Sequence, residues 1–324
     1  INMNNRQIAV LRGGPSEEYQ VSMSTGSEVL SALSRLGYRA RDITITKKGD
    51  WLDGGRVRAP EIILESVDLV FIALHGSYGE DGDVQKILQR LNIPFTGSRA
   101  FSSAVAFNKA LTKKILTDFN ILTPSWREVT NDEEFNLEEA ISDIKSSFGP
   151  EYIVKPVSSG SSFGVSMVRA GEELETVLRK TLETHDRVLV EEFIRGREAT
   201  CATLEYFRNS DLYVFPSIEI IPPRDSLFFD TAVKYNRQTM EICPARFSYG
   251  ERVKLAEVTA LVHQTLDLSQ YSRSDFIINN HGVYFLEVNT LPGLTNESLY
   301  PKAAAAVGLN YDQLIVHLVE TAKV

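Results

Sequence analysis

The chain has few cysteines and no long apolar run. Its 324 residues include two cysteines, Cys201 and Cys243. A scaffold held together by disulfides needs more of them, so the sequence favours a reducing cytoplasm, and we interpret both cysteines as small buried apolar residues. No stretch of about 18 apolar residues occurs, which argues against a membrane span.

Positive charge is also scarce. The chain carries 34 Lys and Arg against 43 Asp and Glu, a formal net charge of −9. Proteins that bind nucleic acid usually have a basic surplus or stripe, so this class of function is disfavoured. An anionic ligand must then be held by local groups such as backbone N–H, a few Lys or Arg side chains, and metal ions. The length predicts two or three domains packed together.

The N-terminal third alternates between strand and helix patterns. Residues 8–11, 42–46 and 67–74 are predicted as strands, and residues 22–36 carry apolar side chains at helical spacing. This alternation predicts a parallel sheet covered by helices. Ligands of such open sheets bind beyond the carboxyl ends of the strands, and His75 directly follows the third strand.

The rest of the chain predicts helices and antiparallel hairpins. Helical spacing predicts single helices over residues 102–120, 131–147, 171–184, 249–266 and 311–322. Strands around small-residue turns predict hairpins over 151–168 and 274–288, with a short strand at 92–97 and further antiparallel strands between 188 and 221. Residues 222–246 lack periodicity, and long loops of this kind in compact chains are often functional.

A pair of carboxylates and an amide on the second hairpin indicate a metal site. Glu287 and Asn289 point to one face of a strand, and Asp275 lies on the neighbouring strand. Such a set of hard oxygen ligands suits Mg²⁺, which also takes phosphate oxygens. A solvated hairpin edge explains the pattern equally well. The turn at Pro292 and Gly293 directly afterwards favours a shaped site.

Two segments rich in small residues are candidates for ligand contact. Residues 158–164 follow Lys155, and their backbone N–H groups and serines could surround phosphate, although a Gly/Ser run is more often a plain turn. The run matches neither the Walker nor the dinucleotide fingerprint. Residues 75–85 place three glycines beside a His and acidic residues, which fits either a binding loop or an irregular surface loop.

Two further residue patterns are ambiguous by themselves. Glu18 stands at the head of a predicted helix, where it either favours the helix dipole or binds a substrate ammonium group. Lys234 and Tyr235 lie in the long loop and have no pattern that sets them apart.

Together these segments resemble the D-alanine–D-alanine ligase family over nearly the whole chain, in the expected order. GGPSEEYQVSMSTG and HGSYGEDGDVQ are similar to the N-terminal signatures of the family. The segments similar to its ATP-binding part are FNKALTKKIL, IVKPVSSGSSFGVS, VLVEEFIRGRE, RSDF and FLEVNTLPGLTNESL. The second signature and the last segment are long and specific, so agreement of both by chance is remote.

The resemblance implies an α/β fold in which an N-terminal open parallel sheet domain is followed by a two-subdomain ATP-grasp fold. The implied domains are residues 1–98, 99–190 and 191–324, with ATP between the last two. The implied reaction phosphorylates the carboxylate of one D-alanine with ATP, and the amine of a second D-alanine then displaces the phosphate. Because an acyl phosphate must be shielded from water, mobile loops are expected to close over it.

The resemblance also implies roles for the residues that match family motifs. For ATP, Lys109 and Lys155 contact the phosphates, a loop that includes Ser162 covers them, the adenine meets Glu191, Glu192, Phe193 and Ile194, and the ribose meets Glu198. Two Mg²⁺ (or Mn²⁺) ions are held by Asp275, Glu287 and Asn289.

For the amino-acid substrates, the resemblance assigns the first ammonium group to Glu18, aided by Ser161 and Tyr235, with His75 beside that subsite. Oxyanion charge is stabilised by Arg273 and the Gly293 N–H. The second carboxylate is held by Lys234 and Ser298.

Three positions depart from the family pattern. Asn108 stands where Asp is usual, Phe163 where Val is commoner, and Thr231 where a Tyr is usual. The loop contact that this Tyr makes in the family is therefore not carried over, and Thr231 is given no role.

The second substrate leaves alternatives open. A ligase that takes D-lactate uses a hydroxyl nucleophile, and such enzymes tend to lack the Tyr found here as Tyr235, so the dipeptide is favoured. D-serine remains an alternative. A different ATP-grasp ligase would lack the segments around Glu18 and His75. The family also implies a homodimer in a bacterial cytoplasm, whose product feeds peptidoglycan synthesis.

Overall fold

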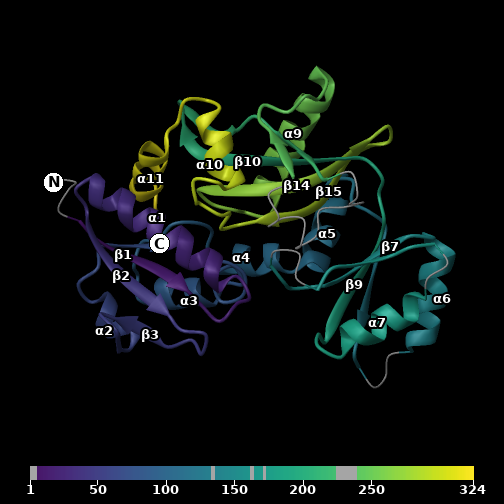
Figure 1. Cartoon of the computed structure of the whole chain (residues 1–324), viewed down its shortest axis with the longest axis horizontal. Helices are drawn as coiled ribbons and strands as arrows, with labels where there is room; N and C mark the ends of the chain where they lie inside the picture. Colours follow the sequence, from purple (N-terminus) through teal and green to yellow (C-terminus); the bar gives the residue numbers. More distant parts are fainter. Residues whose placement is uncertain (1–5, 133–135, 161–163, 171–172, 224–238) are drawn as a thin grey trace.

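The computed structural model describes residues 6–132, 136–160, 164–170, 173–223 and 239–324, which form three sheets with flanking helices (Figure 1). In the first sheet, β1 (Gln7–Gly13) pairs in parallel with β2 (Arg39–Ile45) and β5 (Leu69–Ile72), as the alternation predicts. Two short strands, β3 (Trp51–Asp53) and β4 (Arg56–Val57), extend one edge in antiparallel fashion. They are too short to show a period, so the sequence pattern does not reveal them.

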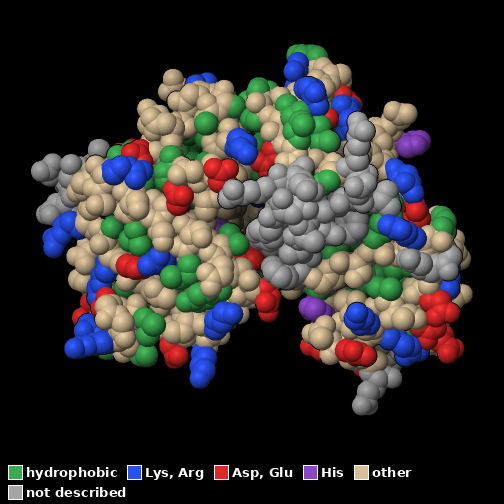
Figure 2. Space-filling model, viewed as in Figure 1, with side chains coloured by type: hydrophobic (Ala, Val, Ile, Leu, Met, Phe, Trp, Pro, Cys, Tyr) green, Lys and Arg blue, Asp and Glu red, His purple; other side chains and the backbone are tan. Residues whose placement is uncertain are grey.

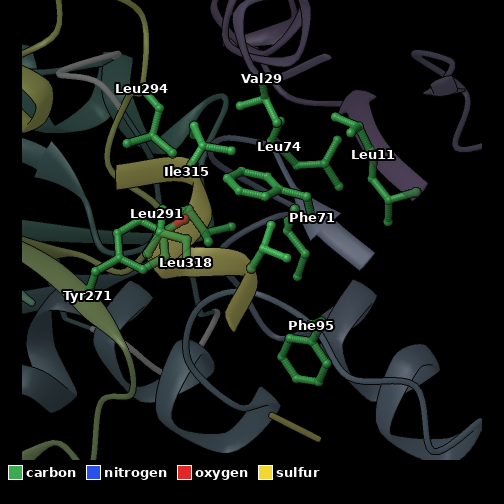
Figure 3. Close-up of a cluster of buried hydrophobic side chains, with 14 of the residues drawn as sticks. Leu11, Val29, Phe71, Leu74, Phe95, Tyr271, Leu291, Leu294, Ile315 and Leu318 are labelled. Atoms are coloured by element: carbon green, nitrogen blue, oxygen red, sulfur yellow. The ribbon is translucent and has the colours of Figure 1, made fainter. Parts of the chain in front are cut away.

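Helices from both ends of the chain pack on this sheet. The apolar face of α1 (Tyr19–Arg35) covers β1, and α11 (Tyr311–Glu320) packs against α1 (Figure 1). Two short helices, α2 (Pro60–Leu64) and α3 (Asp83–Arg90), complete this part of the fold. Figure 3 shows the resulting core, in which side chains from the N-terminal sheet lie among residues from the C-terminal part, labelled Leu11, Val29, Phe71, Leu74, Phe95, Tyr271, Leu291, Leu294, Ile315 and Leu318.

Two predicted elements differ in the structure. In place of a strand at residues 92–97, Phe95 forms isolated bridges with Val70 and Lys323. The helix predicted over 102–120 is two helices, α4 (Ala100–Phe107) and α5 (Lys109–Asp118). Asn108 separates the two helices. Its backbone is extended, and its side chain caps α5 by accepting a hydrogen bond from Leu111 N at 3.0 Å.

The second sheet is antiparallel and lies at the far end of the molecule from α1 (Figure 1). Its order is β6 (Trp126–Thr130), β9 (Arg187–Glu192), β7 (Tyr152–Pro156) and β8 (Ser166–Val168). The predicted β7–β8 hairpin is confirmed. The apolar faces of α6 (Leu137–Ser147) and α7 (Leu174–Leu182) pack on the sheet and bury Val129, Val154 and Val190.

The third sheet carries the predicted metal hairpin. Its strands are β13 (Met240–Ile242), β12 (Ile218–Ile221), β10 (Arg197–Phe207), β14 (Tyr271–Asn279) and β15 (Gly282–Asn289) in that order, with β11 (Ser210–Val214) paired to β10. The sequence pattern misses β13, which lies inside the loop expected at 222–246, and α10 (Leu299–Ala305). The sheet packs against α9 (Tyr249–Thr265), whose first turn is fixed by a capping box between Ser248 and Glu251.

The surface mixes both signs of charge. Figure 2 shows Lys and Arg side chains interspersed with Asp and Glu over the visible face. Within the described ranges, no helix is both long and apolar enough to span a bilayer.

Candidate active site

A cleft lies where the second and third sheets meet. It gathers the predicted ATP contacts that the structure describes, namely Lys109, Lys155, Glu191, Glu192, Phe193, Ile194 and Glu198. The opposite wall comes from the β14–β15 hairpin, and apolar side chains such as Ile153, Ile220 and Leu286 line the remainder. A largely apolar cleft with a few convergent charged groups is the usual form of a nucleotide or small-molecule site.

Lys109 enters the cleft at the first residue of α5. The break at Asn108 places it there, and its backbone N–H donates to Val157 O at 3.0 Å. Its Nζ donates to Ser159 O at 2.6 Å and lies 3.3 Å from a carboxylate oxygen of Glu287. Lys109 therefore connects the small-residue loop to the predicted metal ligands, two groups that are far apart in the sequence.

Lys155 is held in place by a buried group of three charged side chains, Lys113, Glu191 and Lys155 itself, which the sequence analysis did not predict. Glu191 lies between Lys113 and Lys155, with each Nζ 2.8 Å from one of its carboxylate oxygens. Burial lowers the pKa of Lys113 to about 8, although Glu191 opposes this shift. For Glu191, burial favours a higher pKa, but the two lysines outweigh it and hold the pKa below the usual range. The Glu191 side chain is thus directed at lysines.

The signal for Lys113 in the sequence is its spacing. It follows Lys109 by four residues on α5, so both side chains lie on one face of the helix. Its neighbour Lys114 is exposed, and composition alone does not tell the two apart.

The β14–β15 hairpin brings the predicted metal ligands together. Asp275 pairs with Glu287 and Arg273 pairs with Asn289 across the strands, with a bulge after Asp275. Asp275 accepts hydrogen bonds from Thr200 Oγ1 at 2.6 Å and from Arg273 at 2.9 and 3.1 Å. The Asn289 amide donates to it at 3.4 Å. Two carboxylates and an amide oxygen at one end of the cleft fit Mg²⁺, which completes its shell with water and phosphate oxygens.

Asp275, Glu287 and Asn289 provide few ligands for a metal ion. Among the residues that the structure describes, no group of three or more His, Cys, Asp or Glu could hold a metal ion by itself. An ion bound here would complete its shell with water or with oxygens of a ligand in the cleft.

Glu18 lies at the start of α1, beside the base of the small-residue loop. Gly76 and Gly160 approach its carboxylate so closely that a Cβ at Gly160 would collide with it. Ser16 fixes this corner, because its hydroxyl donates to His75 O at 2.6 Å. The corner around Glu18, which is the predicted subsite of the first substrate, thus meets the loop after Lys155. Ser161, Ser162, Lys234, Tyr235, Phe163 and Thr231 lie outside the described residues, so their predicted roles stay predictions.

A second carboxylate, Glu80, lies behind this corner and was not predicted as a site residue. It is buried and accepts a hydrogen bond from Gly76 N at 2.9 Å. Burial and the nearby Glu18 carboxylate raise the pKa of Glu80 to about 8. The sequence showed that the loop is acidic, but it did not show which of the carboxylates turns inward.

His75 and the segment after β15 complete the site. The His75 ring is 4% exposed and lies between Thr25 of α1 and the Leu291 carbonyl. Gly293 is close to Ser298, since a Cβ on Gly293 would lie 2.9 Å from Ser298 Oγ. Ser298 Oγ also accepts from Thr295 N at 3.1 Å, which fixes a tight loop.

Known proteins of one family match this arrangement. A family model described as "D-ala D-ala ligase C-terminus" matches residues 115–320, and one described as "D-ala D-ala ligase N-terminus" matches residues 55–98. A D-alanine–D-alanine ligase from Maridesulfovibrio salexigens is 37% identical over 97% of both chains. One from Bacillus anthracis is 36% identical over 97% of this chain and 96% of its own.

Solved structures agree with these sequence matches. The VanG D-Ala:D-Ser ligase from Enterococcus faecalis superposes with a TM-score of 0.83 at 30% identity, covering 98% of this chain and 99% of its own. The D-alanine–D-alanine ligase from Bacillus anthracis complexed with ATP gives 0.78 at 32% identity, over 98% of this chain and 97% of its own. The fold is therefore the ATP-grasp arrangement expected from the sequence, and the chain belongs to the D-alanine–D-alanine ligase family.

Proposed function

We propose that this protein joins two D-alanines in an ATP-dependent reaction that releases ADP and phosphate. Family membership supports both the ligase activity and the use of ATP. In the structure, the observation that carries the proposal is the meeting of two sites at one loop. Gly160 packs on Glu18, while Ser159 of the same loop accepts from Lys109 in the cleft. A D-alanine whose ammonium group is held at Glu18 would then place its own carboxylate beside the phosphates of ATP.

The chemistry has two steps. The carboxylate of the first D-alanine attacks the γ-phosphorus of ATP, which gives a D-alanyl phosphate and ADP. The amine of the second D-alanine then attacks the acyl carbon, an amide bond forms, and phosphate leaves. Phosphorylation is needed because an oxide ion is a poor leaving group from a carboxylate.

Residues of the cleft would offset the negative charge of the phosphates. Lys109 and Lys155 would bind phosphate oxygens, and Lys155 is held in place by its ion pair with Glu191. Asp275, Glu287 and Asn289 would hold two Mg²⁺ (or Mn²⁺) ions, which offset phosphate charge during transfer.

The remaining wall of the cleft would bind the nucleoside. Glu192, Phe193 and Ile194 line it where β9 ends and would contact the adenine, with Glu198 at the ribose.

Oxyanion charge on the acyl group would be met by Arg273 and the Gly293 N–H, which requires a fixed loop after β15. Glu18 would hold the first ammonium group with Ser161 and Tyr235. Ser298 and Lys234 would hold the second carboxylate.

We further propose three domains, residues 1–98, 99–190 and 191–324, of which the second and third enclose the cleft. We place the enzyme as a homodimer in a bacterial cytoplasm, where its product serves peptidoglycan synthesis. The family relationship supports these assignments.

The second substrate is tested directly by product analysis. The likeness to a D-Ala:D-Ser ligase makes D-serine a second candidate for the acceptor. Purified protein is incubated with ATP, Mg²⁺ and D-alanine, alone or with D-serine or D-lactate, and phosphate release and product mass are measured. D-alanyl-D-alanine as the main product supports the proposal. Preference for D-serine or D-lactate in equimolar competition would replace the acceptor, and no release dependent on D-alanine would refute the proposed activity.

A further inference from the structure

His75 lies where three segments of the chain meet. Its backbone belongs to the loop after β5, and its ring lies between α1 and the segment that follows β15. Nε2 is 2.8 Å from Thr25 Oγ1, and Nδ1 is 2.9 Å from the Leu291 carbonyl oxygen. All three residues are buried, with exposed fractions of 4%, 0% and 2% for His75, Thr25 and Leu291. The ring therefore forms an internal bridge.

The bridge fixes the tautomer of the ring. A carbonyl oxygen can only accept, so Nδ1 must carry the proton that is donated to Leu291. Nε2 of a neutral ring is then an acceptor, and the Thr25 hydroxyl donates to it. Both nitrogens are engaged by the protein itself, which leaves this ring poorly suited to bind a substrate carboxylate directly.

The segment to which His75 is hydrogen-bonded is the one that carries Gly293. Leu291 precedes Gly293 by two residues. The same loop is held at Leu294 by the Tyr311 hydroxyl at 2.7 Å, and at Asn296 by Glu28 of α1 at 2.6 Å. The His75 bridge is thus one of several ties that fasten residues 291–296 to α1 and α11.

We propose that His75 is a positioning residue, which fastens residues 291–298 to α1 and so sets the direction of the Gly293 N–H. This replaces the role beside the first substrate that the family resemblance implies for it. The inference rests on the proposed function for the use of the Gly293 N–H. A donor must lie within about 0.5 Å of its productive place, so a loosened loop slows the chemical step more than it weakens substrate binding.

Two substitutions of His75 separate the two hydrogen bonds. In His75→Asn, the amide nitrogen lies close to the place of Nδ1 and keeps the donor to Leu291. In His75→Gln, the amide lies near the place of Nε2, so the donor to Leu291 is lost. Thr25→Val removes the hydroxyl on the other side with little change of shape. Ser24→Ala is the matched control, because its hydroxyl bonds within α1 on the exposed side.

For each folded variant, kcat and both KM values for D-alanine are measured, with deuterium exchange of the peptide that covers residues 291–298. We expect His75→Gln to lower kcat about tenfold, the effect of about 1.4 kcal/mol, while both KM values stay within about twofold. His75→Asn should recover to within about threefold of wild type. Thr25→Val should lower kcat a few-fold, and Ser24→Ala should match wild type. Exchange of residues 291–298 should be faster in His75→Gln.

Each other outcome contradicts the proposal. A higher KM for D-alanine at unchanged kcat would mean that His75 binds substrate. Equal loss in His75→Asn and His75→Gln, or a Thr25→Val enzyme like wild type, would mean that the bridge is not what matters. If wild-type protein makes no dipeptide, the proposed function fails, and the exchange result alone decides whether the ring fastens the loop. Unchanged exchange in His75→Gln would overturn the bridge.

Discussion

The buried charges of Lys113, Glu191 and Lys155 allow a sharp test of charge balance in the interior. One carboxylate lies 2.8 Å from each of two ammonium groups, so the group sums to one positive charge. Removing Glu191 leaves two buried like charges. Removing Lys113 leaves a balanced Lys155–Glu191 pair. We therefore expect Glu191→Gln to lower the free energy of unfolding more than Lys113→Met does, although the lysine is the more deeply buried residue.

The magnitudes follow from what each change leaves behind. Glu191→Gln should destabilise by about 3–5 kcal/mol, the range for a buried charge that loses its partner. Lys113→Met keeps the apolar stem and loses one charged contact, about 1.5–3 kcal/mol. In the double variant only the Lys155 charge remains. The loss of unfolding free energy in the double variant should be about 0.5–3 kcal/mol smaller than the sum of the losses in the two single variants, because the two residues interact.

Urea unfolding at pH 7, without ATP, measures these differences. Trp126 packs beside Ala110, Val157 and Leu189, so its fluorescence reports on the part of the chain that holds the buried charges. Lys254→Met is the control, since its contact with Glu257 is solvent-exposed and should contribute little. Equal destabilisation by the two single variants, or simple additivity in the double variant, would refute the reasoning from charge balance.

Three further predictions concern the metal ligands, a buried acid and a helix terminus. Glu287→Gln should abolish turnover with an unchanged circular dichroism spectrum, because a ligand for the divalent ions is lost; wild-type rates would remove Glu287 from the metal site. The pKa of Glu80 rises from an ordinary 4.5 to about 8, so the stability that its proton contributes is fully present below pH 4.5 and is lost as the pH rises through about 8. Between pH 4.5 and about pH 8, the unfolding free energy of Glu80→Gln, measured by urea titration, should accordingly fall less than that of wild type. An equal fall would show that Glu80 is ionised normally. Ser248→Ala should destabilise by about 1 kcal/mol through loss of the capping box that starts α9, seen as a lower Tm, and an unchanged Tm would contradict this.

Sequence patterns predicted the parts of the site that depend on strand periodicity. Glu287 and Asn289 were placed on one face of a strand, and the hairpin register then brings Asp275 opposite Glu287. His75 was placed at the end of a parallel strand, and it follows β5 closely. Period and strand order are local properties, which is why these predictions succeed without a structure.

The parts that failed depend on which way a side chain turns after packing. Spacing places Lys113 on the helix face of Lys109, but it does not show that Lys113 is buried while Lys114 is exposed, and nothing local identifies Glu80 as the acid that turns inward. The single helix expected over residues 102–120 also failed, because Asn108 stabilises its break with a cap that competes with helix continuation. The family resemblance supplied the site roles, since no spacing rule joins Glu18 to a loop more than a hundred residues later.

The bridge from Phe95 to Lys323 has a consequence for synthesis of the chain on the ribosome. The core around the first sheet includes Ile315 and Leu318, and Phe95 N donates to Lys323 O at 2.9 Å. The first sheet to emerge therefore lacks part of its interior until residues 311–323 have been translated. During that interval the nascent sheet exposes apolar surface that chaperones could recognise. A stop codon before residue 310 would accordingly damage the first sheet, although that sheet precedes it by more than two hundred residues.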